Sequence, residues 1–320
     1  MSTKYFLIDT QDLDASLVAA WRSIQEREAR FESPYFCPEF TRAVGKVRDD
    51  VRVVVIENDG RPAGFFPHQR AAWGRGSPVG GALSDYHGVI AAPRAEWSVV
   101  GLMRAARLSV WSFDHLVDPA GRFAPYLTAS AAASPQIDLA SFAPPPDFAR
   151  KARKLAREVG ELSFSLHEPA SLGRMFEWKS AQYRASGLTD AFGVRWTRAL
   201  LEELMHGFTG ACSVLRAGDE IVAVHAGMRS KSVLHWWFPA YDSRFAAYSP
   251  GIILLLRIAA ALGSGKIDLG KGDARYKRSL MTGAAPLREG CVELPSLAVA
   301  VRRLLPLRAR RRIERAWRFH

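Results

Sequence analysis

Residues 234–277 read LHWWFPAYDSRFAAYSPGIILLLRIAAALGSGKIDLGKGDARYK, and the rest of the chain is interpreted outward from this stretch. His235–Phe238 has the aromatic content of a β-strand. Ser249 and Pro250 predict the start of a helix, with Ser249 as the N-cap and Pro250 at the first helical position. Ile252–Leu262 then predicts a buried helix, because it is almost wholly apolar and ends at glycine.

Lys266–Leu269 predicts a short strand after this helix, and Gly270–Asp273 predicts a turn that leaves the strand. A loop delivered by a strand to a helix start can bind an anion. The first N–H groups of a helix have no partner within it, and the helix dipole is positive at that end. A plain connection between strand and helix explains the same pattern equally well.

The composition predicts a soluble globular protein with an anionic partner. Hydrophobic residues make up 48% and charged residues 24% of the 320 residues. The 44 lysines and arginines exceed the 32 acidic residues and give a net charge of +12. Nucleic acid, an acidic membrane surface and a phosphorylated cofactor all fit this excess.

The cysteines and the chain start predict a cytoplasmic protein without a bound metal. Cys37, Cys212 and Cys291 are widely spaced and follow no metal-ligand pattern, which indicates reduced thiols. The N-terminal residues show no signal peptide. The apolar run Ile252–Leu262 is too short to cross a bilayer, so we expect any contact with the inner membrane to be peripheral.

The two halves of the chain share a pattern. VRVVVIENDGRPAGFFPHQR from Val51 and CSVLRAGDEIVAVHAGMRS from Cys212 each read as strand, short turn and strand. About two helices precede each hairpin, and a loop, a helix and a strand follow it. This repeat at about half the chain length predicts two similar α/β units. Alanine, serine and proline accumulate between Leu127 and Pro146, so the predicted domains are 1–145 and 146–295.

Residues 296–320 are predicted to form a basic amphipathic tail. VRRLLPLRARRRIERAWRFH, from Val301, carries eight arginines interleaved with apolar residues. Three interpretations remain open: a solvated terminal helix with one apolar stripe, an amphipathic segment on anionic lipid, and contact with RNA.

The second half resembles GNAT-type acyltransferases of the CelD/FemAB-like group. The resemblance rests on the hairpin with His225, the aromatic strand, Tyr241, the Ser249-Pro250-Gly251 helix start and the run from Asp268 to Tyr276-Lys277. In the first half it rests on Ser33-Pro34-Tyr35, Asp59–Phe65 and Ser84–Gly88. It covers most of residues 15–290, and its Tyr-Lys run is fairly specific to the group.

The resemblance implies an α/β (α+β) fold of two tandem GNAT-like domains, each with a mixed, mostly antiparallel sheet flanked by helices. It also implies transfer of an acyl group from a thioester, or from aminoacyl-tRNA in Fem-type members, to an amine. No permanently bound cofactor is expected, and acyl-CoA is the implied co-substrate. Tyr248–Gly251 departs from the glycine-alternating cofactor loop of well-known members, so acyl carrier protein remains an alternative donor.

Amine attack on a thioester requires a base that removes a proton, a donor for the oxyanion and an acid for the leaving thiolate. His225 and Asp273 are the candidate bases, although a structural sheet histidine and a turn aspartate explain them equally well. Lys277 could bind an anion or pair with Asp273. Tyr241 and Tyr276 could protonate the thiolate or pack as core aromatic residues.

The remaining candidates are assigned to binding. The predicted cofactor-binding residues lie at the helix start and the glycine-rich turn: Ser249, Gly251, Gly270 and Gly272. The predicted substrate-binding residues are Asp85, Tyr86, His87, Trp178, Tyr183 and Trp236. Ordinary packing is the alternative for the aromatic members of this set.

Three functions are compatible with these residues. The first is an N-acyltransferase that uses acyl-CoA or acyl carrier protein and an amine of an envelope sugar, a lipid long-chain base or an amino acid, with 301–320 on an anionic membrane surface. The second is a Fem-like transferase that uses charged tRNA. The third is a non-catalytic assembly factor for exopolysaccharide or cellulose synthesis.

Overall fold

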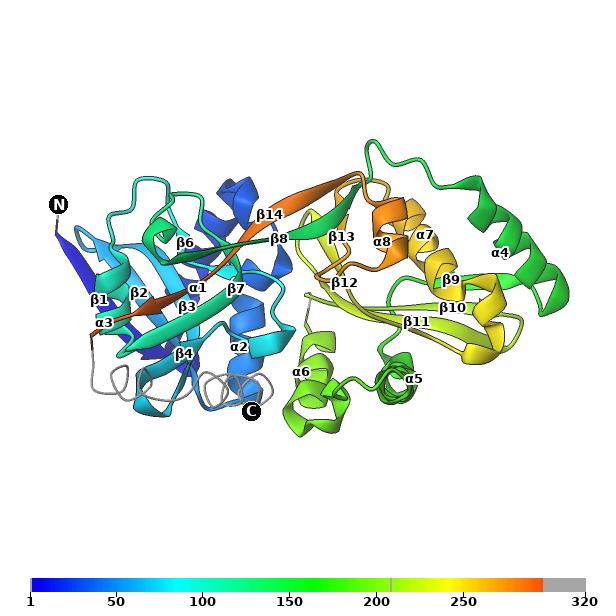
Figure 1. Ribbon diagram of the computed structural model, residues 1–320, viewed down its shortest axis with the longest axis horizontal. Helices are drawn as coiled ribbons and strands as arrows, with labels where there is room; N and C mark the ends of the chain where they lie inside the picture. The colour runs from blue at the N-terminus through cyan, green and yellow to red at the C-terminus, as the bar shows by residue number, and fades with distance from the viewer. Residues whose placement is uncertain (1, 208, 296–320) are drawn as a thin grey trace. The chain divides into compact units, whose positions relative to one another are not determined.

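The computed structural model describes residues 2–207 and 209–295 (Figure 1). The chain forms two compact units. The first unit holds the chain up to Ala133 and resumes at Pro286, and the second spans Ser134–Ala285. The predicted boundaries at 145/146 and 295/296 differ from these positions, because the chain passes between the units inside two strands, β8 (Leu127–Asp138) and β14 (Gly283–Glu293). The predicted tail 296–320 lies outside the described residues.

The first unit contains a mixed sheet in the order β1-β2-β3-β4-β7-β14. All neighbouring pairs in it are antiparallel except β4 and β7. Asp59 and Gly60 both have positive φ in the turn between β2 and β3, which confirms the predicted hairpin. Its elements are β1 (Thr3–Asp9), α1 (Ala15–Arg27), α2 (Pro38–Val47), β2 (Val51–Asn58), β3 (Arg61–Ala71), β4 (Arg75–Ser77), β5 (His87–Gly88), β6 (Ile90–Ala91), α3 (Val99–Ala105) and β7 (Val110–Val117).

The second unit contains a sheet in the order β8-β13-β12-β11-β10-β9. Only β12 and β13 are parallel neighbours in it. Its elements after β8 are α4 (Pro146–Glu158), β9 (Leu162–Ser165), α5 (Leu172–Ala185), α6 (Arg195–Met205), β10 (Gly210–Ala217), β11 (Glu220–Arg229), β12 (Val233–Tyr241), α7 (Pro250–Leu262), β13 (Lys266–Asp268) and α8 (Arg275–Leu280).

The predicted repeat is confirmed by the order of these elements. Each unit runs through a strand, two helices, three antiparallel strands, a helix and a strand parallel to the third strand. The parallel pair requires a crossover connection, which α3 and α7 provide in their units. The fold class is therefore α/β (α+β), with a mixed, mostly antiparallel sheet flanked by helices in each unit.

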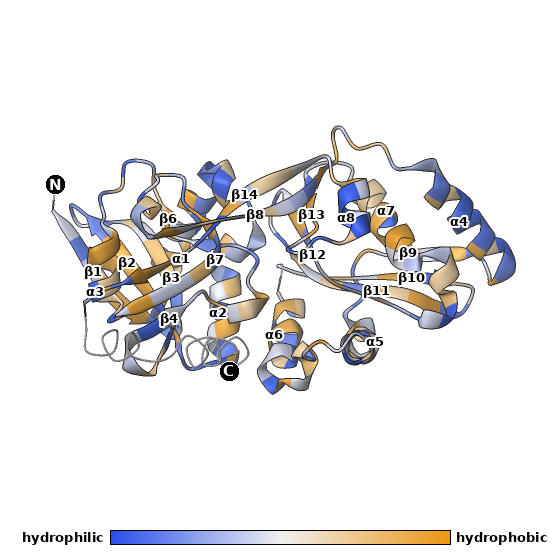
Figure 2. Ribbon diagram, viewed as in Figure 1, coloured by the Kyte–Doolittle hydropathy of each residue, from blue (hydrophilic) through white to orange (hydrophobic). Residues whose placement is uncertain are grey.

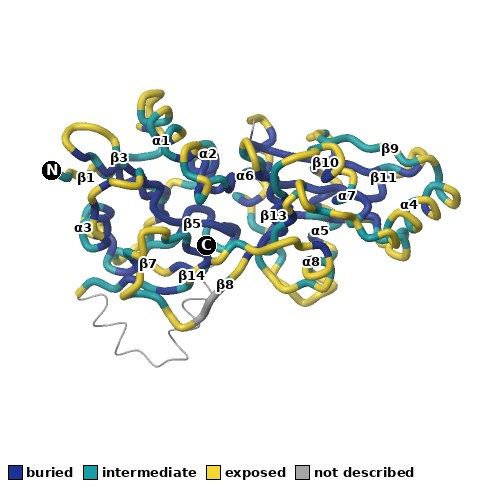
Figure 3. The backbone as a smooth tube through the Cα atoms, turned by 90° about the horizontal axis from the view of Figure 1, so that it is seen from above, coloured by how far each residue is buried: buried dark blue, intermediate teal, exposed yellow. Residues whose placement is uncertain are grey.

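Each unit has its own hydrophobic core between its sheet and helices. Figure 2 shows α7 as mostly hydrophobic and α4 as largely hydrophilic, and Figure 3 shows the central strands as buried. In α7, Leu254, Leu255 and Ile258 are fully buried. Burial of side chains of this size contributes roughly 1.5–3 kcal/mol each. Within residues 2–207 and 209–295, no helix is long and apolar enough to span a membrane.

Candidate functional site

The sheet of the second unit opens where β12 continues beyond the end of β13. The two strands pair over three positions, from Val233 with Lys266 to His235 with Asp268. β12 then runs on to Tyr241, and no described strand pairs with the edge of its last six residues on the β13 side. An open strand edge presents main-chain N–H and C=O groups to a ligand.

A β-bulge lies at the start of this open segment. The register between β11 and β12 shifts by one residue between the Ala226–Phe238 and Met228–His235 pairs. Trp236 and Trp237 therefore both lie opposite Gly227. A Cβ atom on Gly227 would come within 2.2 Å of the His235 carbonyl oxygen, so only glycine allows this approach. Bulges of this kind redirect side chains and leave one residue out of the ladder, often beside active sites.

Asp268 fixes the end of β13. Its side chain is fully buried and accepts hydrogen bonds from Ser134 Oγ at 2.6 Å, Gln136 Nε2 at 2.9 Å and the Gly270 N–H at 2.8 Å. His235 Nδ1 lies 3.3 Å from the same carboxylate. A buried carboxylate is stable only with such a set of partners, so Asp268 holds the turn after β13 in one conformation.

Lys277 closes the same turn from α8. Its buried Nζ donates to the carbonyl oxygens of Gly270 at 3.0 Å and Lys271 at 2.7 Å. Gly270 and Gly272 both have positive φ in this turn, as the predicted glycine-rich turn requires. The alternative pairing of Lys277 with Asp273 is wrong: Asp273 Oδ2 lies 2.6 Å from Arg278 Nη1, and its side chain is 77% exposed.

Lys179 approaches the open segment of β12 from α5. Its Nζ donates to the Pro239 carbonyl oxygen at 3.0 Å. Burial, together with the nearby charge of Lys277, lowers the pKa of Lys179 to about 8. An amine with this pKa is partly neutral near neutral pH and can accept a proton.

Tyr276 approaches β12 from α8. Burial raises the pKa of its hydroxyl, and a hydrogen bond from the Trp236 side chain offsets part of this shift. An indole can only donate, so the tyrosine oxygen accepts and its O–H remains available to another group. Lys179 and Tyr276 thus reach the segment of β12 beyond His235, where Tyr276 contacts Trp236, and Lys277 lies near Lys179.

Tyr241 lies at the end of β12, beside the start of α7. It is 39% exposed, and a Cβ on Gly251 would lie 3.6 Å from its ring. The structure therefore places Tyr241 and Gly251 together, at the opposite end of the open segment from Trp236.

The start of α7 differs from the prediction in one respect. Ser249 has left-handed φ and ψ of 57° and 51°, and its side chain does not cap the helix. Instead its Oγ accepts a hydrogen bond from Lys151 of α4 at 2.9 Å. The Ile252 N–H bonds to the Ser249 carbonyl, and Pro250 has no N–H, which leaves Gly251 as a main-chain donor at this helix start.

His225 is a core residue. It is fully buried and stacks on Trp236, with ring centroids 4.3 Å apart and planes 16° from parallel. Burial lowers its pKa to about 3. Such a weakly basic, enclosed imidazole is unsuited to remove a proton from an amine, so the prediction of His225 as a base gives way to a packing role.

The predicted substrate-binding residues of the first unit are also buried. Asp85, Tyr86 and His87 are each less than 7% exposed. The Tyr86 ring packs against Tyr35, and His87 Nε2 accepts hydrogen bonds from the main-chain N–H groups of Asp114 and His115. Aromatic packing encloses these residues, which argues against their predicted role in substrate binding.

Two more predicted residues lie on α5. Trp178 is partly buried, and the Arg174 guanidinium lies 5.8 Å above its ring. Tyr183 packs against Phe192, and Lys179 Nζ lies 5.5 Å from its ring. Tyr183 is therefore linked to the candidate site through Lys179, whereas Trp178 contacts Arg174 on the same helix.

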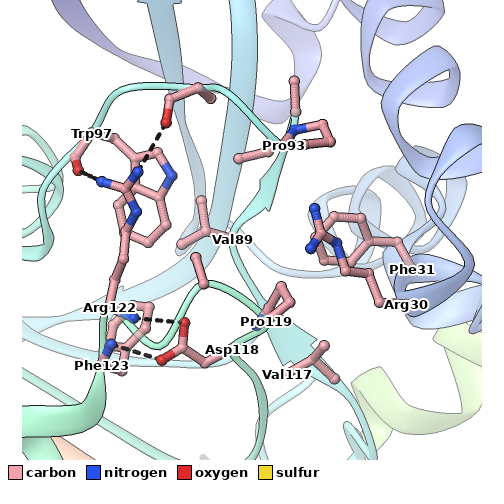
Figure 4. Close-up of a pocket in the computed structure, with 14 residues that line it drawn as sticks. Arg30, Phe31, Val89, Pro93, Trp97, Val117, Asp118, Pro119, Arg122 and Phe123 are labelled. Atoms are coloured by element: carbon pink, nitrogen blue, oxygen red, sulfur yellow. Dashed lines mark hydrogen bonds between the residues drawn. The ribbon is translucent and has the colours of Figure 1, made fainter.

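A separate cavity of about 200 Å³ lies in the first unit (Figure 4). Its walls include Val89, Pro93 and Phe31, and Arg122 closes one side by donating to the carbonyl oxygens of Ala95 and Trp97. Asp118 accepts from the N–H groups of Arg122 and Phe123 and fixes the loop that carries Arg122. Arg122 and Asp118 are therefore occupied in holding the walls of this cavity.

Sequence reasoning did not predict the buried contacts of Lys179 and Asp268. A lysine on an amphipathic helix usually indicates a solvated face, and Asp268 is one residue of a three-residue strand. The aromatic strand and the Tyr-Lys run were the signals that pointed to this part of the unit.

The comparisons with known proteins agree with this geometry. Residues 147–278 match the family model described as acetyltransferase (GNAT) domain. No curated protein matches the sequence significantly.

Three similar solved structures share the fold at low identity. FemX has a TM-score of 0.58 at 10% identity, covering 95% of this chain and 100% of that one. The C-terminal domain of a putative lysylphosphatidylglycerol synthetase from Agrobacterium fabrum has a TM-score of 0.56 at 14% identity, covering 89% of this chain and 94% of that one. A tandem GNAT protein from the clavulanic acid biosynthesis pathway has a TM-score of 0.54 at 12% identity, covering 92% of this chain and 100% of that one. Residues 147–278 thus match an acetyltransferase (GNAT) domain, and the fold of the chain is similar to that of a tandem GNAT protein.

Proposed function

We propose that this protein transfers an acyl group from a thioester to a primary amine at the open segment of β12. One observation carries the proposal: β12 separates from β13 after three paired residues, and Lys179 and Tyr276 reach that segment from two helices. A thioester bound along the open edge would have a proton acceptor and a hydroxyl donor beside it.

Lys179 is the proposed base. A free alkylamine has a pKa near ~10 and is mostly protonated at neutral pH. With its pKa lowered to about 8, Lys179 is neutral often enough to take a proton from the attacking amine. The amine nitrogen forms a bond to the carbonyl carbon, and the carbonyl electron pair moves onto oxygen. The C–S bond then breaks as the carbonyl re-forms, and the sulfur leaves as a thiolate that takes up a proton.

Tyr276 is the proposed donor to the charge that develops in this reaction. Its O–H can donate to the tetrahedral oxyanion or to the leaving sulfur, because its oxygen already accepts from Trp236. Its raised pKa keeps the hydroxyl protonated. Asp268 and Lys277 are positioning residues that hold the turn from which α8 and Tyr276 begin.

The donor is proposed to enter at the start of α7. The Gly251 N–H, the helix dipole and the cationic Lys151 and Lys154 of α4 lie there. These groups favour an anionic part of the donor, and both acyl-CoA and acyl carrier protein carry a phosphate on the arm that bears the thiol. Because this helix start offers the Gly251 N–H rather than several main-chain N–H groups, binding of the donor's phosphate depends more on the lysine side chains than on the main chain.

The proposed acceptor is an amine of an envelope sugar, a lipid long-chain base or an amino acid, used by a cytoplasmic protein at the inner face of the membrane. One similar structure is a domain of a putative lysylphosphatidylglycerol synthetase, and the product in that name is a lipid. This supports a lipid among the three acceptors.

Aminoacyl-tRNA is the alternative donor. The exposed basic surface of α4 beside the start of α7 favours it. An assay that measures the amide product for every donor, and thiol release for the two thioesters, decides between the donors. Purified protein is given acyl-CoA, acyl carrier protein thioester or charged tRNA, each with an amine mixture and with or without RNase. We expect amine-dependent thiol release that RNase does not affect. Transfer only from charged tRNA, abolished by RNase, would contradict the proposal.

A further inference from the structure

Two exposed residues of the first unit have left-handed backbone conformations. Trp73, at the tip of the β3–β4 hairpin, has φ and ψ of 60° and 26° and is 82% exposed. Arg107, between α3 and β7, has φ of 54° and is also exposed. Bulky residues rarely adopt this conformation.

The loops that carry these residues are joined. The Ser109 N–H donates to the Gly74 carbonyl oxygen at 2.6 Å, and a Cβ on Gly74 would lie 2.9 Å from Ser109 Oγ. The Leu294 N–H in turn donates to the Ser109 carbonyl oxygen at 2.8 Å. Three segments of the chain therefore meet at Ser109, and the third of them leads directly into residues 296–320.

This region is basic and partly apolar. The stretches 70–77 and 104–109 contain four arginines and no acidic residue, and the acidic neighbours include Glu293 at the end of β14 and Asp50, whose carbonyl oxygen accepts from the Arg70 N–H. Arg70, Arg104 and Arg107 are exposed, whereas Arg75 is partly buried. Between α3 and the end of β14 lies a shallow groove whose lining includes Val100, Met103, Leu108 and Leu294 together with Arg104 and Arg107.

We propose that this Trp73 face, made of Trp73, Arg70, Arg104, Arg107 and the groove, docks the protein onto an anionic lipid bilayer. An indole has an apolar body and one N–H donor, and tryptophan is enriched at the interface between lipid and water. Each arginine near an anionic surface adds about 1 kcal/mol of attraction. The sequence of residues 296–320 is also rich in arginine.

An RNA partner fits this face less well. Binding of single-stranded RNA typically uses several aromatic side chains on which successive bases stack. Here one tryptophan stands beside an apolar groove, an arrangement that matches the headgroup and acyl boundary of a bilayer. Docking would bring the protein to a lipid-borne amine, but it does not require the reaction proposed above.

The test measures binding of the full chain to vesicles of phosphatidylcholine with and without phosphatidylglycerol, by co-sedimentation. Trp73→Gly removes the ring while suiting the left-handed backbone, so the loop keeps its conformation. Arg104→Glu with Arg107→Glu reverses the charge. The matched control is Arg61→Glu with Arg94→Glu, two exposed arginines near the other end of β3.

We expect binding only to vesicles with phosphatidylglycerol. The Trp73 and Arg104/Arg107 variants should each lose at least roughly tenfold in affinity, and the Arg61/Arg94 variant should lose much less. Brominated lipid should quench the fluorescence of the wild type more than that of Trp73→Phe. Equal losses in the Arg61/Arg94 control, or wild-type binding to RNA but not to vesicles, would overturn the proposal.

Discussion

Asp268 and Lys277 bind opposite sides of the same glycine. Asp268 Oδ1 accepts from the Gly270 N–H at 2.8 Å, and Lys277 Nζ donates to the Gly270 carbonyl oxygen at 3.0 Å. The two charged side chains therefore fix the turn between β13 and α8, and with it the position from which Tyr276 reaches β12. The proposed chemistry depends on this turn.

Asp268→Ala should destabilise the protein strongly. The substitution leaves the donors of Ser134, Gln136 and Gly270 without their acceptor, and the loss of hydrogen bonds to a buried charge costs roughly 3 kcal/mol in total. Urea unfolding measures the free energy of unfolding. Asp273→Ala is the matched control, because this carboxylate is exposed and its ion pair with Arg278 is worth less than about 1 kcal/mol. Similar decreases in the free energy of unfolding for Asp268→Ala and Asp273→Ala would refute the role given to Asp268.

Lys179 should give acyl transfer a characteristic pH dependence. A base must be neutral to accept a proton, so kcat/KM should rise with pH up to about 8, the lowered pKa of Lys179, and then level off. Lys179→Arg keeps the positive charge but cannot lose its proton in this range. The variant should therefore be inactive at every pH, whereas a retained rise near pH 8 would assign the base elsewhere.

Buried histidines should make the protein less stable in acid. Burial lowers the pKa of His225 to about 3 and of His68 to about 4, so both are neutral in the folded state at neutral pH. The unfolded chain binds protons below about pH 6.5, so stability is lost as the pH falls from there towards 4. Each histidine contributes up to about 1.4 kcal/mol per pH unit to this slope. His68→Gln should reduce the slope measured by urea unfolding, and an unchanged slope would exclude His68 as a contributor.

The sequence predicted the architecture well because the fold depends on local patterns. The turn at Asp59-Gly60, the helix after Pro250 and the repeated hairpins follow from residue preferences that act over a few positions. The sequence did not predict that the chain passes from one unit to the other within β8 and β14, because a strand that continues past a domain boundary leaves no local signal.

Prediction of the site was less complete for the same reason. Tyr276, Lys277 and Trp236 lie in the distinctive stretch and were named, but the roles of His225 and Asp273 depend on burial and partners that the sequence does not contain. The contact of Lys179 with Pro239 joins residues about 60 positions apart. Such contacts are set by the tertiary structure.

The central claim is acyl transfer at the open segment of β12, with Tyr276 as the donor to the developing charge. The most direct measurement follows an isotope-labelled acyl group from its thioester to an amine by mass spectrometry, with wild-type protein and Tyr276→Phe. The phenylalanine keeps the packing but leaves the Trp236 N–H without its acceptor, so the variant should stay folded with a somewhat lower melting temperature. We predict a labelled amide from the wild type and a turnover rate lower by about 10²-fold in the variant. Equal rates in the two proteins, or no labelled amide from the wild type, would contradict the account.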